Sequence, residues 1–267
     1  MIEKEKEAEL LKTAINAAKF GGEEIMKIYA QEFEVFNKED NSPLTIADQN
    51  ANKVIEKLLK ETNIPILSEE GKHADFDERK NWRQLWIVDP LDGTKEFIKR
   101  NGEFTVNIAL IENHIPTLGV VYAPVLNQLY FSSKKLGSFK LSVDLTDYDV
   151  ENLIDSSVKL PLIREDKTYT IVASRSHLSK ETLDFIEGIK KDKGDVHLIS
   201  KGSSLKLCLV AEGSADCYPR FAPTMEWDTA AGQAICEYAG FKVIDWETKE
   251  NLLYNRPKLL NNWFVVN

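Results

Sequence analysis

Residues 85–94 read Leu85-Trp86-Ile87-Val88-Asp89-Pro90-Leu91-Asp92-Gly93-Thr94. The four apolar residues at the start of this stretch predict a buried β-strand. Pro90 cannot donate a hydrogen bond to a neighbouring strand, so we expect the chain to leave the sheet directly after Asp89. Gly93 allows a close backbone approach, and Thr94 begins a predicted short helix over residues 94–99. Two carboxylates and a hydroxyl are therefore expected to converge on one point.

Such a pair of carboxylates calls for a cation. Two carboxylates about 4 Å apart repel each other by roughly 4 kcal/mol at an effective dielectric constant of 20. An all-oxygen ligand set favours Mg²⁺, Mn²⁺ or Ca²⁺ over zinc. The alternative is an ordinary turn, because Asp, Pro and Gly are the residues that turns use.

Two further acidic segments precede this stretch. Ser68-Glu69-Glu70-Gly71 follows an apolar segment at 64–67, and Thr45-Ile46-Ala47-Asp48 opens a predicted helix over about 46–61. We expect Thr45 at the N-cap of that helix and Asp48 in its first turn. Taken singly, Asp48 could merely complete a capping box, and Glu69 with Glu70 could belong to a solvated loop.

Hydrophobic periodicity organises the rest of the chain. Apolar residues at helical spacing, beginning with Ala8, Leu11 and Ile15, predict an N-terminal helix. Strands over 105–111, 118–122 and 129–132 predict an antiparallel sheet flanked by the first two helices. Residues 141–167 are polar and irregular. Beyond them we expect strands at 169–173, 196–199, 215–218 and 241–244, alternating with helices at 179–190, 203–211 and 228–239. This alternation indicates an α/β layer.

Length and charge limit the classes of protein to consider. The 267 residues suggest two coupled halves, an α+β half over 1–141 and an α/β half over 142–267. Acidic residues outnumber basic ones by 43 to 34, which gives a net charge of -9 and argues against a nucleic acid polymer as partner. An anionic substrate would need local positive charge.

Other bulk features suggest a cytoplasmic protein. The three cysteines, Cys208, Cys217 and Cys236, have neither disulfide-framework nor zinc-site spacing. We expect no secretion signal, because the N-terminal residues mix both charges, and no transmembrane segment, because no apolar run approaches 18 residues. Peripheral contact with the inner membrane face stays open, as does the choice between monomer and homodimer.

Taken together, the motifs resemble the inositol monophosphatase superfamily, and within it the bacterial 3'(2'),5'-bisphosphate nucleotidases of the CysQ type. The resemblance is carried by residues 41–45, 67–70, 86–107 and 227–232. It implies an α/β fold of the inositol monophosphatase and fructose-1,6-bisphosphatase type, a layered αβαβα sandwich.

The resemblance also implies roles for individual residues. Metal ligands would be Glu69, Asp89, Asp92, Asp228 and the backbone carbonyl of Leu91. Asp48 and Thr94 match the pair that positions and deprotonates the attacking water. Asp228, considered without the family, is expected to be the N-cap of its helix. Two or three Mg²⁺ ions are implied, with Mn²⁺ as a substitute and with inhibition by Li⁺.

The implied reaction removes the 3'-phosphate of adenosine 3',5'-bisphosphate by in-line attack of a metal-activated water, without a phosphoenzyme, and gives AMP and phosphate. Kinship also implies a place in sulfur metabolism. The phosphate that is not cleaved would be held by His177, Ser203, Lys206 and Arg220. The remaining substrate contacts would come from Gly93, Thr94 and Asp228.

Three other interpretations stay open. An inositol monophosphatase, or another small sugar-phosphate phosphatase of the superfamily, is the main rival, although Leu91 and the pair Lys95-Glu96 favour the nucleotidase branch. A haloacid dehalogenase-type phosphatase is disfavoured because two residues, not one, separate Asp89 from Asp92. A non-catalytic regulator that binds metal or nucleotide is disfavoured because all the expected carboxylates are present.

Overall fold

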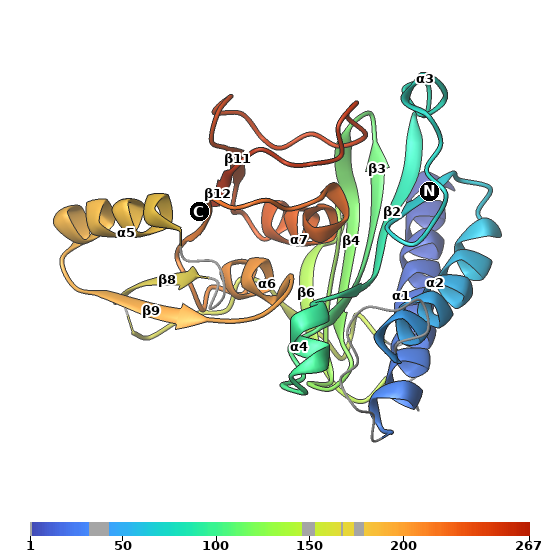
Figure 1. The fold of residues 1–267 in the computed structure, drawn as a ribbon, viewed down its shortest axis with the longest axis horizontal. Helices are drawn as coiled ribbons and strands as arrows, with labels where there is room; N and C mark the ends of the chain where they lie inside the picture. Colours follow the sequence, from blue (N-terminus) through green and yellow to red (C-terminus); the bar gives the residue numbers. More distant parts are fainter. Residues whose placement is uncertain (1, 32–42, 146–152, 167, 174–178) are drawn as a thin grey trace.

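A seven-stranded sheet forms the centre of the molecule (Figure 1). The computed structural model describes residues 2–31, 43–145, 153–166, 168–173 and 179–267. The strands are β1 (Ile66–Ser68), β2 (Gln84–Asp92), β3 (Thr105–Glu112), β4 (Ile115–Ala123), β5 (Gln128–Ser133), β6 (Gly137–Ser142) and β7 (Val158–Lys159). They lie in sequence order, with β1 parallel to β2 and every later pair antiparallel. The expected antiparallel sheet is therefore confirmed.

Helices cover both faces of this sheet, and the alternation of side chains along β2 shows how. Trp86 and Val88 belong to the core beneath α1 (Ile2–Tyr29) and α2 (Pro43–Lys60). Leu85 and Ile87 point the other way, into a second core formed with α6 (Leu205–Ala211) and α7 (Glu226–Tyr238). Because both faces are buried, β2 is an almost continuous apolar run.

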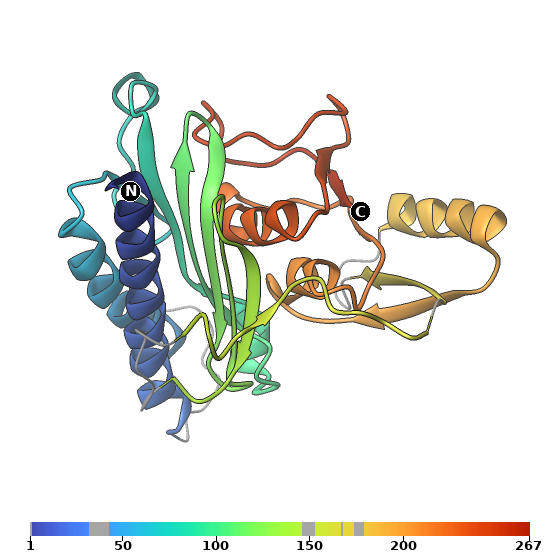
Figure 2. The same cartoon turned by 180° about the vertical axis from the view of Figure 1, so that it is seen from behind.

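A further pair of layers lies beyond α6 and α7. One small sheet has the order β10 (Tyr218–Arg220), β12 (Phe264–Val266), β11 (Val243–Asp245), and β8 (Tyr169–Ala173) pairs in parallel with β9 (Val196–Ser200). α5 (Lys180–Lys193) is the outermost element (Figure 2). From α1 and α2 to α5, the layers follow the order α, β, α, β, α, which confirms the predicted sandwich.

α7 lies unusually close to the large sheet at Gly119 on β4. A Cβ atom added to Gly119 would be 2.3 Å from the carbonyl oxygen of Ala231 in α7. A side chain here would collide with helix backbone, which cannot move independently of the rest of α7. The missing side chain thus sets the distance between α7 and the sheet.

Several details differ from the sequence-based expectations. α2 begins at Pro43, so Thr45 is not its N-cap, and Asp48 lies beyond the first turn. Proline suits the first helical position, where its missing N–H is not needed. The segment 141–167 contains the end of β6 and the strand β7. β12 was not expected at all, because three apolar residues carry little periodic signal.

The structure also describes the cysteines and the apolar character of the helices. The three cysteines are buried and unpaired. Within the described part of the chain, no helix combines the length and the apolar character needed to cross a membrane.

Candidate active site

β2 carries two aspartates on the face that packs against α7. Asp89 pairs with Asn107 of β3, and Asp92 pairs with Thr105, so β2 has one extra residue over this interval. A bulge of this kind reverses the alternation of side chains. Leu91 accordingly lies in the core beneath α1 and α2. Three positions apart on a regular strand, Asp89 and Asp92 would face opposite ways, and the bulge turns both toward α7.

The expectation that the chain leaves the sheet at Pro90 was therefore wrong. The missing N–H of Pro90 falls within the bulge, where ladder pairing is interrupted in any case. The backbone N–H of Leu91 donates instead to Asp89 Oδ1, at 3.0 Å. After Asp92 the strand ends at Gly93, whose φ of 102° is in the left-handed region, and α4 (Thr94–Ile98) begins.

α7 brings Asp228 to the same place. The predicted N-cap role was wrong, because Met225 is the N-cap and Asp228 is the third helical residue. Asp228 Oδ2 accepts a hydrogen bond from the N–H of Met225 at 2.8 Å, as in a capping box. One carboxylate oxygen from each of Asp89, Asp92 and Asp228 lies within 4.8 Å of the others.

β1 and α2 add two more carboxylates. The N–H of Glu69 donates to the carbonyl of Val88 at 3.1 Å, which continues the parallel pairing of β1 with β2 and places Glu69 beside Asp89. Asp48 approaches from α2, and its Oδ1 atom is buried without a hydrogen-bond partner among the described residues. The structure thus gathers the five predicted carboxylates from four separate elements.

The pKa values of four carboxyl groups in this cluster are raised. Burial is the largest cause, and the neighbouring carboxylates add to it. The pKa of Asp48 rises to about 8, that of Asp228 to about 7 and that of Glu69 to about 6. The pKa of Asp89, the most buried of them, is also raised well above its ordinary value.

The residues fit a divalent cation. All side-chain donors are oxygen atoms, as Mg²⁺ prefers. Asp48 Oδ1 is a buried acceptor to which no described residue donates, and buried acceptors of this kind are rare unless something else satisfies them. Asp89, Asp92 and Asp228 could hold an ion between them, and Glu69 and the carbonyl of Leu91 lie on the segments beside them.

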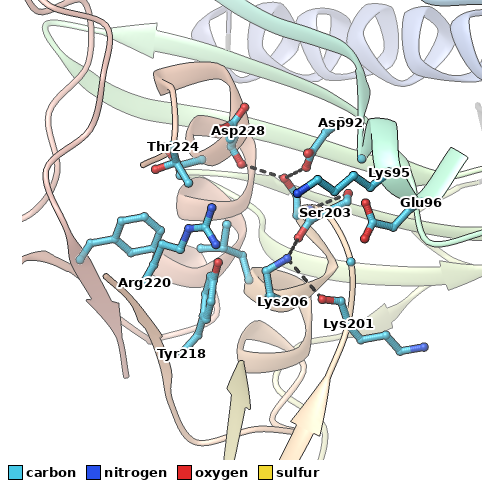
Figure 3. A pocket seen from close by; sticks show the side chains of 16 residues that line it. Asp92, Lys95, Glu96, Lys201, Ser203, Lys206, Tyr218, Arg220, Thr224 and Asp228 are labelled. Atoms are coloured by element: carbon cyan, nitrogen blue, oxygen red, sulfur yellow. Dashed lines mark hydrogen bonds between the residues drawn. The ribbon is translucent and has the colours of Figure 1, made fainter. Parts of the chain in front are cut away.

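A cavity lies directly beside the aspartates and is lined by positive charge. Asp92 and Asp228 form one side of it, and Lys206, Tyr218 and Arg220 lie across from them (Figure 3). Gly93 and Ser203 also line it, so five of the residues predicted to bind substrate share one cavity, and one of them, Asp228, is with Asp92 also a predicted metal ligand. Sequence reasoning assigned no role to the other residues that line it, among them the polar residues Lys95, Glu96, Lys201, Ser204, Tyr218 and Thr224.

Two of the residues predicted to bind substrate, Thr94 and His177, are not among the residues that line the cavity. Thr94 is exposed at the first position of α4, outside the set that lines it. His177 lies outside the described residues. The roles proposed for both stay predictions from the resemblance.

The two cations opposite the aspartates differ in how they are held. Lys206 is 7% exposed, and its Nζ donates to the carbonyl of Ser203 at 2.6 Å. Burial lowers the pKa of Lys206 to about 8. Arg220 donates from Nη2 to the carbonyl of Pro223 at 2.9 Å, while its buried Nε has no partner among the described residues. Arg220 thus retains an unused donor beside the cavity.

Buried Glu103 fixes the loop that carries the serines. Its Oε2 accepts from the N–H of Gly202 at 2.9 Å, and Oε1 accepts from Lys201 Nζ at 3.2 Å. Ser203 follows with a φ of 52°, an uncommon value for a residue with a side chain. Sequence reasoning assigned no role to Glu103, because a single carboxylate in a run of mixed residues carries no spacing signal.

Known proteins resemble this chain over almost its whole length. The model of the inositol monophosphatase family matches residues 6–265. The 3'(2'),5'-bisphosphate nucleotidase CysQ of Salmonella typhimurium is 43% identical over 261 residues, which are 96% of this chain and 99% of that protein.

Solved structures agree with this match. The crystal structure of CysQ from Bacteroides thetaiotaomicron is 54% identical, with a TM-score of 0.91 over 96% of this chain and 95% of that one. An inositol monophosphatase from Zymomonas mobilis shares the fold, with a TM-score of 0.73 at 21% identity over 98% of this chain and 92% of its own. The chain therefore belongs to the inositol monophosphatase family.

Proposed function

We propose that this chain is a Mg²⁺-dependent phosphomonoesterase that converts adenosine 3',5'-bisphosphate to AMP and phosphate. One observation carries the proposal: Asp89, Asp92 and Asp228 converge within 4.8 Å beside a cavity whose opposite side holds Lys206 and Arg220. The acidic side of the cavity would hold cations, which would offset negative charge on a scissile phosphate. The basic side can bind a second phosphate of the same substrate. Relatives named 3'(2'),5'-bisphosphate nucleotidase support this choice.

Each group has a separate task in the proposed reaction. Asp89, Asp92, Asp228, Glu69 and the Leu91 carbonyl would hold two or three Mg²⁺ ions, or Mn²⁺ in their place. Bound ions would stabilise negative charge on the phosphate and acidify a water. Asp48, whose Oδ1 has no hydrogen-bond partner among the described residues, would accept the proton of that water, with Thr94 orienting it.

The basic side of the cavity, formed by Lys206 and Arg220, would determine which phosphate ester is preferred. The guanidinium of Arg220 lines the cavity and can donate to a phosphate oxygen, and Lys206 keeps its charge below about pH 8. A monoester without a second phosphate would leave this side unused. The proposed preference therefore rests on the distance between two phosphates on one substrate.

Phosphate release from adenosine 3',5'-bisphosphate, measured with Mg²⁺ and again after EDTA treatment, tests the proposal. We expect turnover with Mg²⁺, loss of turnover with EDTA and inhibition by Li⁺. The same assay with inositol 1-phosphate tests the second candidate, which the family description supports. A higher kcat/KM for inositol 1-phosphate would replace the proposed substrate, and no release from any monoester would favour a non-catalytic regulator.

Cytoplasmic location and the monomer or homodimer state stay predictions.

A further inference from the structure

We propose that Ser204 is a positioning residue that orients Asp92 for cation binding. The proposal rests on the cation site of the proposed function, but not on which phosphate ester is hydrolysed. Ser204 comes from the loop before α6, whereas Asp92 lies on β2. The two residues meet although 112 positions separate them in sequence.

The hydroxyl of Ser204 lies between two parts of the site. Its Oγ is 2.8 Å from Asp92 Oδ2 and 2.8 Å from the backbone carbonyl oxygen of Asp228. A hydroxyl has one hydrogen, and a carboxylate is a stronger acceptor than a backbone carbonyl. The hydrogen is therefore directed mainly to Asp92. Ser204 is 3% exposed, so water does not compete for these contacts.

Asn107 of β3 fixes the direction of this hydrogen bond. Its Nδ2 donates to Ser204 Oγ at 2.8 Å, which occupies a lone pair of the hydroxyl and leaves its hydrogen for Asp92. On the other side, Asn107 Oδ1 accepts from the hydroxyl of Thr105 at 2.9 Å. Donors and acceptors run in one order from Thr105 to Asn107, Ser204 and Asp92, and such chains strengthen each member.

This arrangement decides which oxygen of Asp92 faces a cation. Oδ2 accepts from Ser204, and Nδ2 of Asn107 also lies 3.3 Å from it. Oδ1 is then the oxygen left for a cation shared with Asp89 and Asp228. Groups that orient a metal-binding carboxylate in this way typically change metal affinity by about 10–100-fold when they are removed.

Mn²⁺ binding tests the proposal without any substrate, with free Mn²⁺ measured by electron paramagnetic resonance. For Ser204→Ala we expect the Kd for Mn²⁺ to rise about tenfold or more. Ser204→Thr keeps the hydroxyl and is expected to bind nearly as well as wild type. Asn107→Ala should raise the Kd for Mn²⁺ by a similar factor. In the variant that carries both substitutions, the Kd should rise by less than the product of the two single factors, because both residues act through one hydrogen-bond chain.

Ser138→Ala is the matched control. Ser138 is a buried serine of β6 whose hydroxyl donates to the carbonyl of Ile235 in α7 at 2.7 Å. The substitution removes a buried serine hydrogen bond to α7 without touching a carboxylate, so Mn²⁺ affinity should stay unchanged while thermal stability falls. Circular dichroism establishes that each variant is folded.

Several outcomes would overturn the role of Ser204. Folded Ser204→Ala with wild-type Mn²⁺ affinity would do so, as would an equal loss of affinity in Ser138→Ala or an absence of Mn²⁺ binding in the wild type. A wild type that binds Mn²⁺ but hydrolyses no ester would instead overturn the proposed function, and a selective loss of affinity in Ser204→Ala would still support the positioning role.

Discussion

Asp48 shows how burial can prepare a single side chain for chemistry. Its Oδ1 has no hydrogen-bond partner among the described residues, and its pKa rises to about 8 because of burial and of the charges on Glu70 and Glu69. Cations bound beside Glu69 would offset these charges and lower the pKa of Asp48, which would let it act as a base near neutral pH. The family resemblance drew attention to Asp48, but only the packing of α2 against the other carboxylates gives it this character.

Asp48→Asn keeps the shape of the side chain and removes its ability to accept a proton. We expect phosphate release to fall by about 10²–10⁴-fold, the usual contribution of a general base. Thermal stability should stay equal or rise, because a buried acid is lost. Asp184→Asn is the control, since Asp184 is exposed on α5 and pairs only with Lys180 among the ion pairs described. Full turnover in Asp48→Asn would remove Asp48 from the mechanism.

Arg220 is expected to distinguish substrates by their second phosphate. A hydrogen bond to a charged group contributes about 1.5–3 kcal/mol, so Arg220→Gln should raise KM for adenosine 3',5'-bisphosphate by roughly tenfold or more. The kcat value should change little, because the side chain would contact the phosphate that is not cleaved. Adenosine 3'-monophosphate is the comparison substrate. An equal loss for both substrates would place Arg220 at the scissile phosphate.

At the scale of elements, the distance between α7 and the large sheet is critical. α7 carries Asp228 in its first turn, and β2 carries Asp89 and Asp92. The bulge in β2 turns both aspartates toward the helix. Gly119 on the neighbouring strand β4 allows the helix to approach them. A shift of α7 would therefore separate the carboxylates.

Gly119→Ala tests this packing. The new Cβ would lie 2.3 Å from the carbonyl oxygen of Ala231, so the helix must move or the variant must lose about 1–3 kcal/mol of unfolding free energy. The affinity for Mn²⁺ should also fall in Gly119→Ala, because a shift of α7 would move Asp228 away from Asp89 and Asp92. The control is Gly188→Ala in α5, where a Cβ would meet nothing within 4 Å, and where alanine should stabilise the helix by about 0.5–1 kcal/mol. Equal melting temperatures for the two variants would contradict the prediction.

The free energy of folding of the whole molecule must offset the electrostatic repulsion between the clustered carboxylates. These come from α2, β2, α7 and the residue that follows β1. Folding buries Asp89 to 1% exposure and raises its pKa. This makes the ion-free site a source of instability that the rest of the fold must offset. Protons or cations can relieve it, and the two should compete.

Stability of the ion-free protein should depend on pH in a defined direction. A carboxyl whose pKa is higher in the folded state binds more protons there, so the free energy of unfolding falls as pH rises from the unfolded to the folded pKa. For Asp228 this window runs from 3.8 to about 7, and for Asp48 it extends to about 8. Thermal unfolding in EDTA should therefore show a lower melting temperature at pH 7 than at pH 5.5. A melting temperature that rises from pH 5.5 to pH 7 would contradict the raised pKa values of Asp228 and Asp48.

Mg²⁺ should reverse much of this loss. Binding to the folded state alone stabilises by about 2.7 kcal/mol when free Mg²⁺ is 100 times its Kd. The melting temperature should rise on titration with Mg²⁺ at pH 7.5, and less at pH 5.5, where protons occupy the same oxygens. An equal rise at both pH values would argue for binding elsewhere on this acidic surface.

Much of the site could be predicted from local sequence and resemblance, and the failures have physical causes. Asp89, Asp92, Glu69 and Asp228 carry motif signals, and the structure brings them together. Ser204, Asn107 and Glu103 were not assigned roles, because their importance depends on contacts between segments about 100 residues apart. The limits of α2 and the position of Asp228 were misjudged by two or three residues, as capping preferences are weak compared with tertiary packing.

The sequence by itself determined the order of most helices and strands, the set of acidic residues and the family, because hydrophobic periodicity and short motifs are local properties of a chain. The tertiary structure decided how those acids are oriented. The Pro90 segment became a bulge instead of an exit from the sheet, and so Asp89 and Asp92 face the same side. It also placed Lys206 and Arg220 opposite them. Orientation and raised pKa values arise only when distant segments exclude water from one another, and no stretch of sequence contains that information alone.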